Sequence, residues 1–395
     1  MPAGRHFLQI PGPSNVPDRI LRAMDYPTMD HRGPAFADVG RKALEGMKRI
    51  FKTAGRVVIY PSSGTGAWEA ALVNTLSPGD TVLMYETGHF ATLWKKLAEK
   101  LGLNPVFIEG DWRSGADAAA IEEHLRGDKG KEVKAVCVVH NETSTGSVTD
   151  VAAVRRAIDA VGHSALLMVD TISSLASVDY RHDEWGVDVT VAGSQKGLML
   201  PPGLSFNAVS NKAMKASESA GLIRSYWSWA EMAGPNDTGY LPYTPATNLL
   251  YGLNRGDQYT GRGGARERLP PACAARRAAA RAAVEAWGLE VLCNKASDRS
   301  PVLTAVMVPE GHSADNFRAV TLRNYDMSLG NGLSKVADRV FRIGHLGDFN
   351  DLMLIGTLGG VEMGLRDAGV PYRAGGVQAA MAVLGQTGPA NRAAA

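Results

Sequence analysis

A single lysine, Lys196, stands between two apolar runs of the chain. Residues 187–192 before it are apolar and β-branched, which predicts a buried strand, and the residues after it lead into Pro201-Pro-Gly203. Burial disfavours the charged form of an amine and lowers its pKa, and a neutral amine can form a Schiff base with a carbonyl group. The alternative is a lysine whose stem packs on apolar surface while its head reaches water, and Lys196 alone does not decide between the two.

Asp170 and the segment His140-Asn-Glu-Thr143 follow two other apolar runs in the same way, after residues 165–169 and 134–139. Polar side chains at the carboxyl ends of buried parallel strands are placed to meet a ligand. Asp170 could instead cap a turn. The histidine and glutamate of the second segment suggest acid–base catalysis or a metal, but no second histidine stands at ligand spacing, so we predict no metal site.

The turn Pro61-Ser-Ser-Gly-Thr-Gly66 lies between an expected strand, 57–60, and an expected helix, 67–76. Glycines let the backbone approach a ligand closely, and free N–H groups at a helix start attract an anion. We therefore expect Ser63, Gly64 and Thr65 to cradle a phosphate, with a tight turn and polar helix cap as the alternative. The turn matches neither the nucleotide P-loop, which ends in Gly-Lys-Ser/Thr, nor the dinucleotide-binding Gly-x-Gly-x-x-Gly.

Arg342 and Phe90 are two further candidates. Arg342 lies within the apolar run 340–344, and a buried arginine needs an anionic partner, either a substrate carboxylate or an internal salt bridge. Phe90 follows the run 81–84, where its ring could stack on a flat ligand or join the core. A lysine, an aspartate, a phosphate cradle and an arginine at strand ends together form the set that pyridoxal phosphate requires, since a carboxylate on the ring nitrogen makes the ring an electron sink.

The elements that must position these residues alternate along the first two thirds of the chain. Continuous apolar runs separated by segments of helical period predict a mostly parallel sheet with helices on both faces. Residues 150–161 are expected to form a helix with Asp150 as its N-cap, and 204–209 an antiparallel strand. Beyond residue 251, strands at 304–308 and 340–344 among helical segments predict a smaller α+β domain.

The composition is that of an ordinary globular protein and excludes several other classes. The 395 residues are 45% hydrophobic and 21% charged, and the formal net charge of +2 gives no reason to expect nucleic acid or an anionic membrane as partner. No apolar run has the ~20 residues of a membrane span, and no signal peptide is recognisable. The three cysteines are widely spaced, which favours a reducing compartment, so we expect a cytoplasmic protein.

The motifs resemble those of the class V aminotransferases of fold type I, and within them the serine–glyoxylate and alanine–glyoxylate group. The resemblance implies a large domain with a mostly parallel seven-stranded sheet and a smaller C-terminal α+β domain. We expect an N-terminal arm over 1–15, the large domain over 16–252 and the small domain over 253–395. The matching segments span nearly the whole chain: Pro11-Gly-Pro-Ser-Asn15, Ser63-Gly-Thr-Gly66, His140-Asn-Glu-Thr143, Asp170, Gly193-Ser-Gln-Lys196, Tyr243-Thr-Pro245 and Phe341-Arg-Ile-Gly344.

The resemblance also implies roles for individual residues. Lys196 would form the Schiff base with pyridoxal 5'-phosphate and act as the base in the 1,3-proton shift, and Asp170 would pair with the ring nitrogen. Arg342 would hold the substrate carboxylate, with Gly12 lining the pocket. The cofactor would be held further by Ser63, Gly64, Thr65 and Gln195 at the phosphate, Phe90 on the ring, Thr143 near the ring hydroxyl, and Tyr243 and Thr244 reaching the phosphate of a neighbouring subunit.

The implied activity is transfer of the amino group of L-serine to glyoxylate, giving hydroxypyruvate and glycine, by a homodimer with shared active sites. Alanine or aspartate as the amino donor is the alternative within the family. A pyridoxal-phosphate lyase such as a cysteine desulfurase is a more distant one, because desulfurases resemble this fold but carry His before the lysine and a catalytic Cys on a mobile loop. Here Gln195 precedes Lys196.

One segment, 254–280, departs from the family pattern. It holds six arginines and little to bury, so we expect a poor helix in its first half and a solvated connection. A pair of compensating reading-frame shifts would produce such a departure, and an intact-mass measurement would exclude them. The segment lies outside the motifs above, so the expected site does not depend on it.

Overall fold

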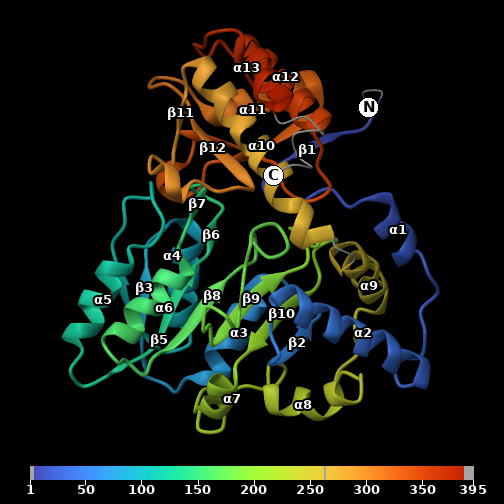
Figure 1. Cartoon of the computed structure of the whole chain (residues 1–395), viewed down its shortest axis with the longest axis vertical. Helices are drawn as coiled ribbons and strands as arrows, with labels where there is room; N and C mark the ends of the chain where they lie inside the picture. Colours follow the sequence, from blue (N-terminus) through green and yellow to red (C-terminus); the bar gives the residue numbers. More distant parts are fainter. Residues whose placement is uncertain (1–3, 262–263, 387–395) are drawn as a thin grey trace.

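A seven-stranded sheet carries the first two thirds of the chain (Figure 1). The computed structural model describes residues 4–261 and 264–386, without the side chains of 257–273. β10 is antiparallel to both of its neighbours, whereas the adjacent strands from β9 to β4 are parallel, which confirms the predicted α/β fold with a mostly parallel sheet. The strand order is β2 (Arg56–Tyr60), β10 (Ser205–Val209), β9 (Val189–Gly193), β8 (Leu166–Asp170), β5 (Val133–Val139), β3 (Thr81–Tyr85) and β4 (Asn104–Ile108).

Helices cover both faces of this sheet because its strands are apolar on both sides. Alternate strand residues enter two separate cores: Val57 and Ile59 join one, and Val58 and Tyr60 the other. The first core includes side chains of α2 (Pro34–Phe51), α5 (Ala118–Gly127), α6 (Val151–Ala160) and α9 (Thr247–Gly261). The second includes those of α3 (Gly64–Thr75), α4 (His89–Lys100), α7 (Asn211–Ser217) and α8 (Trp229–Asp237).

A second sheet of five strands lies above the first in Figure 1 and takes its edge strand from the start of the chain. Its order is β1 (Phe7–Gln9), β13 (Met327–Asn331), β14 (Val340–Gly344), β12 (Leu303–Met307) and β11 (Glu290–Val291). β1 pairs in parallel with β13, so the predicted N-terminal arm is part of this sheet. The domain limits stay a prediction, and the limit at 252/253 falls inside α9. The remaining elements are α1 (Asp18–Met24), α10 (Gly264–Trp287), α11 (Ala314–Tyr325), α12 (Asp351–Asp367), α13 (Gly376–Gln386), the hairpin β6 (Asn141–Glu142) with β7 (Ser147–Val148), and the 3₁₀ turns η1 (Ala296–Asp298) and η2 (Ser334–Val336).

The expectation of a poor helix within 254–280 is wrong for the backbone that the structure describes, which is helical over 254–261 and 264–280. Tertiary packing accounts for the helix in the second half of this segment. Ala275, Ala279 and Ala280 are buried in a core shared with α12 and α13. Small side chains let helices approach closely, and this packing supports a helix whose sequence offers little amphipathic pattern.

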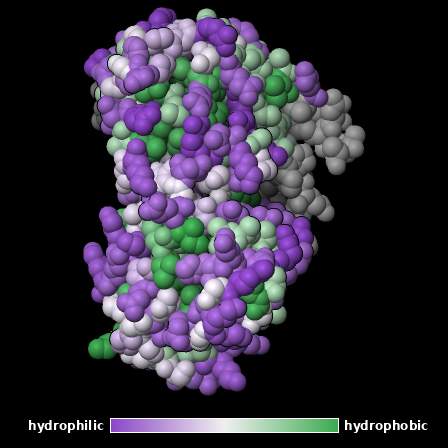
Figure 2. All heavy atoms as spheres, turned by 90° about the vertical axis from the view of Figure 1, so that its left-hand side faces the viewer, coloured by the Kyte–Doolittle hydropathy of each residue, from purple (hydrophilic) through white to green (hydrophobic). Residues whose placement is uncertain are grey.

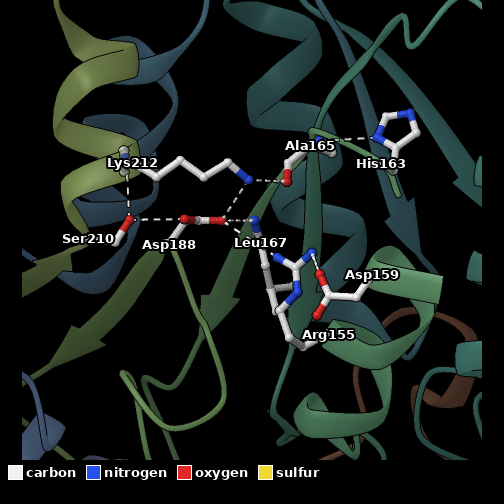
Figure 3. Close-up of polar contacts among 9 residues, drawn as sticks. Arg155, Asp159, His163, Ala165, Leu167, Asp188, Ser210 and Lys212 are labelled. Atoms are coloured by element: carbon white, nitrogen blue, oxygen red, sulfur yellow. Dashed lines mark hydrogen bonds and ion pairs between the residues drawn. The ribbon is translucent and has the colours of Figure 1, made fainter. Parts of the chain in front are cut away.

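Asp188 fixes the amino end of β9, the strand that leads to Lys196 (Figure 3). Its carboxylate accepts hydrogen bonds from the backbone N–H of Leu167 and the hydroxyl of Ser210, both at 2.9 Å. Arg155 of α6 and Lys212 of α7 approach the same carboxylate at 3.9 and 3.5 Å. A hollow of about 620 Å³ opens beside this network. Since both cations already face Asp188, we assign the network to stability.

The predicted caps and the surface agree with this architecture. Asp150 accepts a hydrogen bond from the N–H of Ala153 at 2.8 Å, which confirms it as the N-cap of α6. Figure 2 shows the face on the left of Figure 1, where most side chains are hydrophilic and the apolar ones gather in separate patches. Within residues 4–261 and 264–386, no helix is both long and apolar enough to cross a bilayer.

Candidate active site

Lys196 and Asp170 meet at the carboxyl edge of the large sheet. β8 ends with Asp170 itself, and Asp170 is in register with Val191 of the parallel strand β9. Lys196 is the third residue after β9, in a turn that Ser194 holds through a hydrogen bond from its hydroxyl to the carbonyl of Pro201 at 2.7 Å. The two predicted catalytic residues therefore come from neighbouring strands.

Lys196 is covered by the N-terminal arm. Its Nζ donates to the carbonyl oxygen of Pro11 at 2.8 Å, and the hydroxyl of Ser14 donates to the carbonyl of Lys196 at 2.8 Å. Gly12 lies against the lysine side chain, since a Cβ there would stand 2.3 Å from Nζ, and its φ of +118° favours glycine. Burial, with a contribution from the charge of Arg342, lowers the pKa of Lys196 to about 8. A large share of the amine is therefore neutral in mildly alkaline solution.

The carboxylate of Asp170 is oriented by two hydrogen-bond donors, one to each of its oxygens. Oδ1 accepts the N–H of Ile172 at 2.7 Å, and Oδ2 accepts the indole N–H of Trp68 at 3.0 Å. Burial, together with the charge of Glu142, raises the pKa of Asp170 to about 7, although both hydrogen bonds and Lys196 oppose the shift. A cationic ring nitrogen beside this carboxylate would remove the cost of its burial.

The start of α3 offers its N–H groups to an anion. Ser63 occupies the N-cap position with no side-chain hydrogen bond to the helix, and Ser63 and Thr65 are exposed. Gly64 packs on Ile172, where a Cβ would lie 2.2 Å from the Ile172 Cδ1. Oε1 of Gln195 is buried with no hydrogen-bond partner among the described residues. The free helix N–H groups fit a ligand with a phosphate group. The unpaired Oε1 of Gln195 needs a donor, so it is the NH2 group of this amide that could bind a phosphate oxygen.

The loop after β5 connects this edge to α4. Glu142 is buried, and its carboxylate accepts from the N–H groups of Phe90, Ala91 and Ser144 and from the Ser144 hydroxyl. It therefore caps α4 from another element, because Gly88 at the N-cap has no side chain to do so. Burial raises the pKa of Glu142, while these hydrogen bonds oppose the shift. Phe90 is thus held at the site edge, half-buried and edge-on to the ring of His89.

Arg342 reaches the site from β14 of the second sheet. Its Nε donates to the carbonyl of Asn331 at 2.7 Å and its Nη1 to the carbonyl of Thr143 at 2.8 Å. Burial lowers its pKa to about 10, so the side chain stays charged at neutral pH. Both partners are neutral carbonyls, and none of the ion pairs in the described part of the chain includes Arg342, which argues against the internal salt bridge.

Two predicted residues are bound elsewhere. The hydroxyl of Tyr243 donates to Glu231 at 2.8 Å and its ring stacks on Tyr226, and Thr244 is exposed. This placement leaves their predicted action across a subunit interface as a proposal.

The sequence did not single out two residues that contact the site, Trp68 and Asn331. It quoted Pro11 and Glu142 within motifs, but without the contacts that they make. Trp68 stands one turn into the helix after the glycine turn, and that spacing could have indicated that its side chain looks back toward the strand ends. His140, which the sequence analysis considered for acid–base catalysis, directs its ring away from this role. Its Nδ1 pairs with Ser174, and burial lowers its pKa to about 4. Across the described ranges, no cluster of three His, Cys, Asp or Glu side chains could hold a metal ion.

Comparison with known proteins agrees with this geometry. The chain is 46% identical over 388 residues to a serine–glyoxylate aminotransferase of Methylorubrum extorquens, covering 96% of each chain. It is 45% identical to an L-aspartate–glyoxylate aminotransferase of Paracoccus denitrificans, again with 96% of each covered. Its structure is similar to that of a ureidoglycine–glyoxylate aminotransferase of Bacillus subtilis, with a TM-score of 0.89, 26% identity and coverage of 98% and 99%. Residues 6–344 match the aminotransferase class-V family, and the chain belongs to that family.

Proposed function

We propose that this enzyme is a pyridoxal-phosphate-dependent transaminase that moves the amino group of L-serine to glyoxylate, giving hydroxypyruvate and glycine. The observation that carries the proposal is the meeting of a buried lysine of lowered pKa, Lys196, with a buried carboxylate, Asp170, beside the uncapped start of α3. The serine–glyoxylate name of the Methylorubrum relative supports the choice of substrates.

The residues present fit the cofactor. The free N–H groups of α3 would donate to the phosphate, and the NH2 group of the Gln195 amide could do the same. When bound, pyridoxal phosphate supplies an electron sink for the electrons released as a proton leaves the substrate Cα. The residues proposed to hold it are Lys196, Asp170, Ser63, Gly64, Thr65, Gln195, Phe90 and Thr143, with Tyr243 and Thr244 contributed by a second copy of the chain.

The side chains of this chain have distinct tasks in the proposed reaction. In a share of the molecules the Nζ amine of Lys196 is neutral at mildly alkaline pH. This amine takes the proton from the substrate Cα and returns it at the second carbon of the 1,3-proton shift. Asp170, fixed by Trp68 and Ile172, holds negative charge where a ring nitrogen would stand. Arg342 orients the substrate through its carboxylate with the N–H groups that the backbone carbonyls leave free.

Aspartate as donor is the second candidate, because the Paracoccus relative that carries that name is nearly as similar. Alanine remains a third. A desulfurase is disfavoured by the described cysteines. Cys137 and Cys293 are both buried, and burial raises the pKa of both thiols, that of Cys293 to about 11. A homodimer in the cytoplasm completes the proposal, resting on the resemblance for the dimer and on the cysteine usage for the compartment.

A panel of donors tests the substrate assignment. The purified enzyme is assayed with glyoxylate and L-serine, L-alanine or L-aspartate, and glycine formation is measured. We expect L-serine to have the highest kcat/KM. A higher value for L-aspartate or L-alanine would replace the donor in the proposal.

Lys196→Ala serves as the matched control for chemistry. The variant is expected to lose turnover with every donor and to lose the visible absorption band that bound pyridoxal phosphate gives, because no other amine replaces Nζ. Retention of both would contradict the role of Lys196.

A further inference from the structure

His89 begins α4 directly before Phe90, and its ring reaches across to the second sheet. Its Nδ1 lies 2.7 Å from the hydroxyl of Ser334 in η2. Ser334 adopts a φ of +48°, a conformation uncommon for residues other than glycine. Next to it, Nζ of Lys335 pairs with the buried Glu86 at 2.5 Å, so η2 is held on the large sheet independently of His89.

His89 and Arg342 are connected through contacts of two other segments, 143–144 and 331–334. The backbone N–H of His89 is bound by the hydroxyl of Ser144 at 2.9 Å, and the neighbouring Thr143 gives its carbonyl to Arg342. On the other side, Arg342 donates to the carbonyl of Asn331, three residues before the Ser334 that His89 contacts. Two routes of contacts thus connect His89 to Arg342, and the positive charge of Arg342 acts on the imidazole.

In its neutral form, the imidazole of His89 has one N–H group that can donate a hydrogen bond. Burial, then the positive charges of Arg342 and Lys96, lower its pKa, so the ring is neutral at neutral pH. When the Ser334 hydroxyl donates to Nδ1, the ring proton resides on Nε2. His89 is half-buried rather than enclosed, and the hydrogen bonds of its ring in the described structure are made through Nδ1.

Arg342 leaves room for such a donor. Two of its five N–H bonds go to the carbonyls of Asn331 and Thr143, so the guanidinium offers the remaining ones to a ligand. A carboxylate has about four acceptor positions, more than one side of an arginine fills. An oxygen of the same carboxylate is therefore free for a neighbouring neutral donor.

We propose that His89 is a second substrate-binding residue, whose Nε2–H donates to the carboxylate that Arg342 holds. The inference rests on the proposed function in that it places the substrate carboxylate at Arg342. It adds a contact that would act on donor and acceptor substrates alike, since both carry a carboxylate.

Two substitutions separate this role from a structural bridge. Asn at position 89 keeps a polar atom where Nδ1 lies and can still bond Ser334, but it has nothing at the place of Nε2. Gln carries an amide near the Nε2 position and lacks the inner atom. His89→Asn should therefore lose carboxylate binding, His89→Gln should recover most of the loss, and Ser334→Ala, which removes only the bridge, serves as the control.

The readout is binding of two carboxylates that lack an amino group, 3-hydroxypropionate and propionate, to the holoenzyme by titration calorimetry. His89→Asn is expected to weaken both by about tenfold, the size of one hydrogen bond to a charged group. Steady-state assays of the same variant should show a higher KM for donor and glyoxylate with kcat little changed.

Three outcomes would overturn the proposal. The first is unchanged binding in His89→Asn. The second is a loss in His89→Gln and Ser334→Ala that exceeds the loss in His89→Asn, which would make His89 a bridge only. The third is a loss confined to 3-hydroxypropionate, which would assign the contact to a substrate hydroxyl. Since neither probe is transaminated, these results do not depend on which amino donor the panel identifies.

Discussion

At the scale of residues, the pKa values of Lys196 and Asp170 lie close together. Burial lowers that of the amine to about 8 and raises that of the carboxyl to about 7. Burial therefore disfavours the charged form of each group in the empty protein. Such a site lowers the stability of the empty protein, and binding of a cationic ring and a carbonyl carbon compensates for it.

The Asp170 carboxyl gives the empty protein a specific pH dependence. Its pKa is about 7 in the fold and 3.8 ordinarily, so the native state binds more protons than the unfolded chain between these values. The free energy of unfolding should fall as pH rises from about 4 to about 7, by up to ~4 kcal/mol. Asp170→Asn should remove this slope. Urea unfolding of both cofactor-free proteins at pH 5 and pH 8 measures it, and an equal change in the two proteins would contradict the prediction.

Arg342 allows a second residue-scale prediction. Arg342→Ala should lower kcat/KM for the amino donor and for glyoxylate together, by roughly 2–5 kcal/mol of transition-state binding, because it removes a buried charge that faces a carboxylate. Arg342→Lys keeps a charge but cannot donate to Asn331 and Thr143 while also gripping a ligand, so it should rescue only part. Kinetic constants unchanged in Arg342→Ala would make this arginine structural.

The sequence predicts which residues carry the chemistry but not the individual contacts that hold them. The residue types of Lys196, Asp170 and Arg342 indicate their chemistry because charge within an apolar run is costly and so requires a partner. The partners themselves carry no such signal. Trp68 looks like an ordinary core residue until the fold turns its indole N–H toward Asp170, and the motif around Glu142 does not indicate that its carboxylate caps α4.

At the scale of elements, the network around Asp188 joins β8, β9, α6 and α7 at the end of the sheet opposite to Asp170. It fixes the start of the two strands whose ends carry the catalytic pair. Because Asp188 is buried, its carboxylate has no water to replace these partners.

Asp188→Ala should therefore lower the free energy of unfolding by about 3 kcal/mol, since it leaves the N–H of Leu167 without its acceptor and removes the buried charge that Arg155 and Lys212 face. Asp159→Asn is the matched control. Asp159 also bonds Arg155, at 2.6 Å, but is 65% exposed, so its loss should cost less than about 1 kcal/mol. Thermal unfolding of both variants tests the contrast, and equal melting temperatures would show that the network contributes little.

Most elements could be predicted because their signals are local. Strands 57–60, 81–84 and 165–169 read as apolar runs, and Asp150 as a cap, and the structure agrees within a residue or two. The helix over 264–280 could not be predicted, because its packing partners α12 and α13 lie far along the chain from it. β4 (Asn104–Ile108) was also missed, since Asn104-Pro105 at its start resembles a turn.

At the scale of the whole molecule, the positions of Tyr243 and Thr244 favour a shared site. Both lie at or near the surface, and Tyr243 donates to Glu231 of α8 rather than contacting Lys196. Within a single chain, the motif residues Tyr243 and Thr244 therefore have no contact with Lys196 that would explain a role in the site.

A heterodimer gives them a direct test. We expect the enzyme to be a dimer by analytical ultracentrifugation and Tyr243→Phe to weaken cofactor binding. In a heterodimer of Lys196→Ala and Tyr243→Phe chains, purified through two different tags, one site would regain both side chains, so activity should recover to about half of wild type. If Tyr243 serves its own chain, the heterodimer should show only half of the Tyr243→Phe activity.

The N-terminal arm has a consequence for how the molecule is made. β1 pairs with β13, and Pro11 and Gly12 close over Lys196. The residues of β1 can therefore take their place only after the strand Met327–Asn331, much later in the chain, has been made. Lys196 stays uncovered during that interval, so the cofactor can reach its amine before the arm seals it. The order of synthesis thus allows the cofactor to bind before the N-terminal arm covers Lys196.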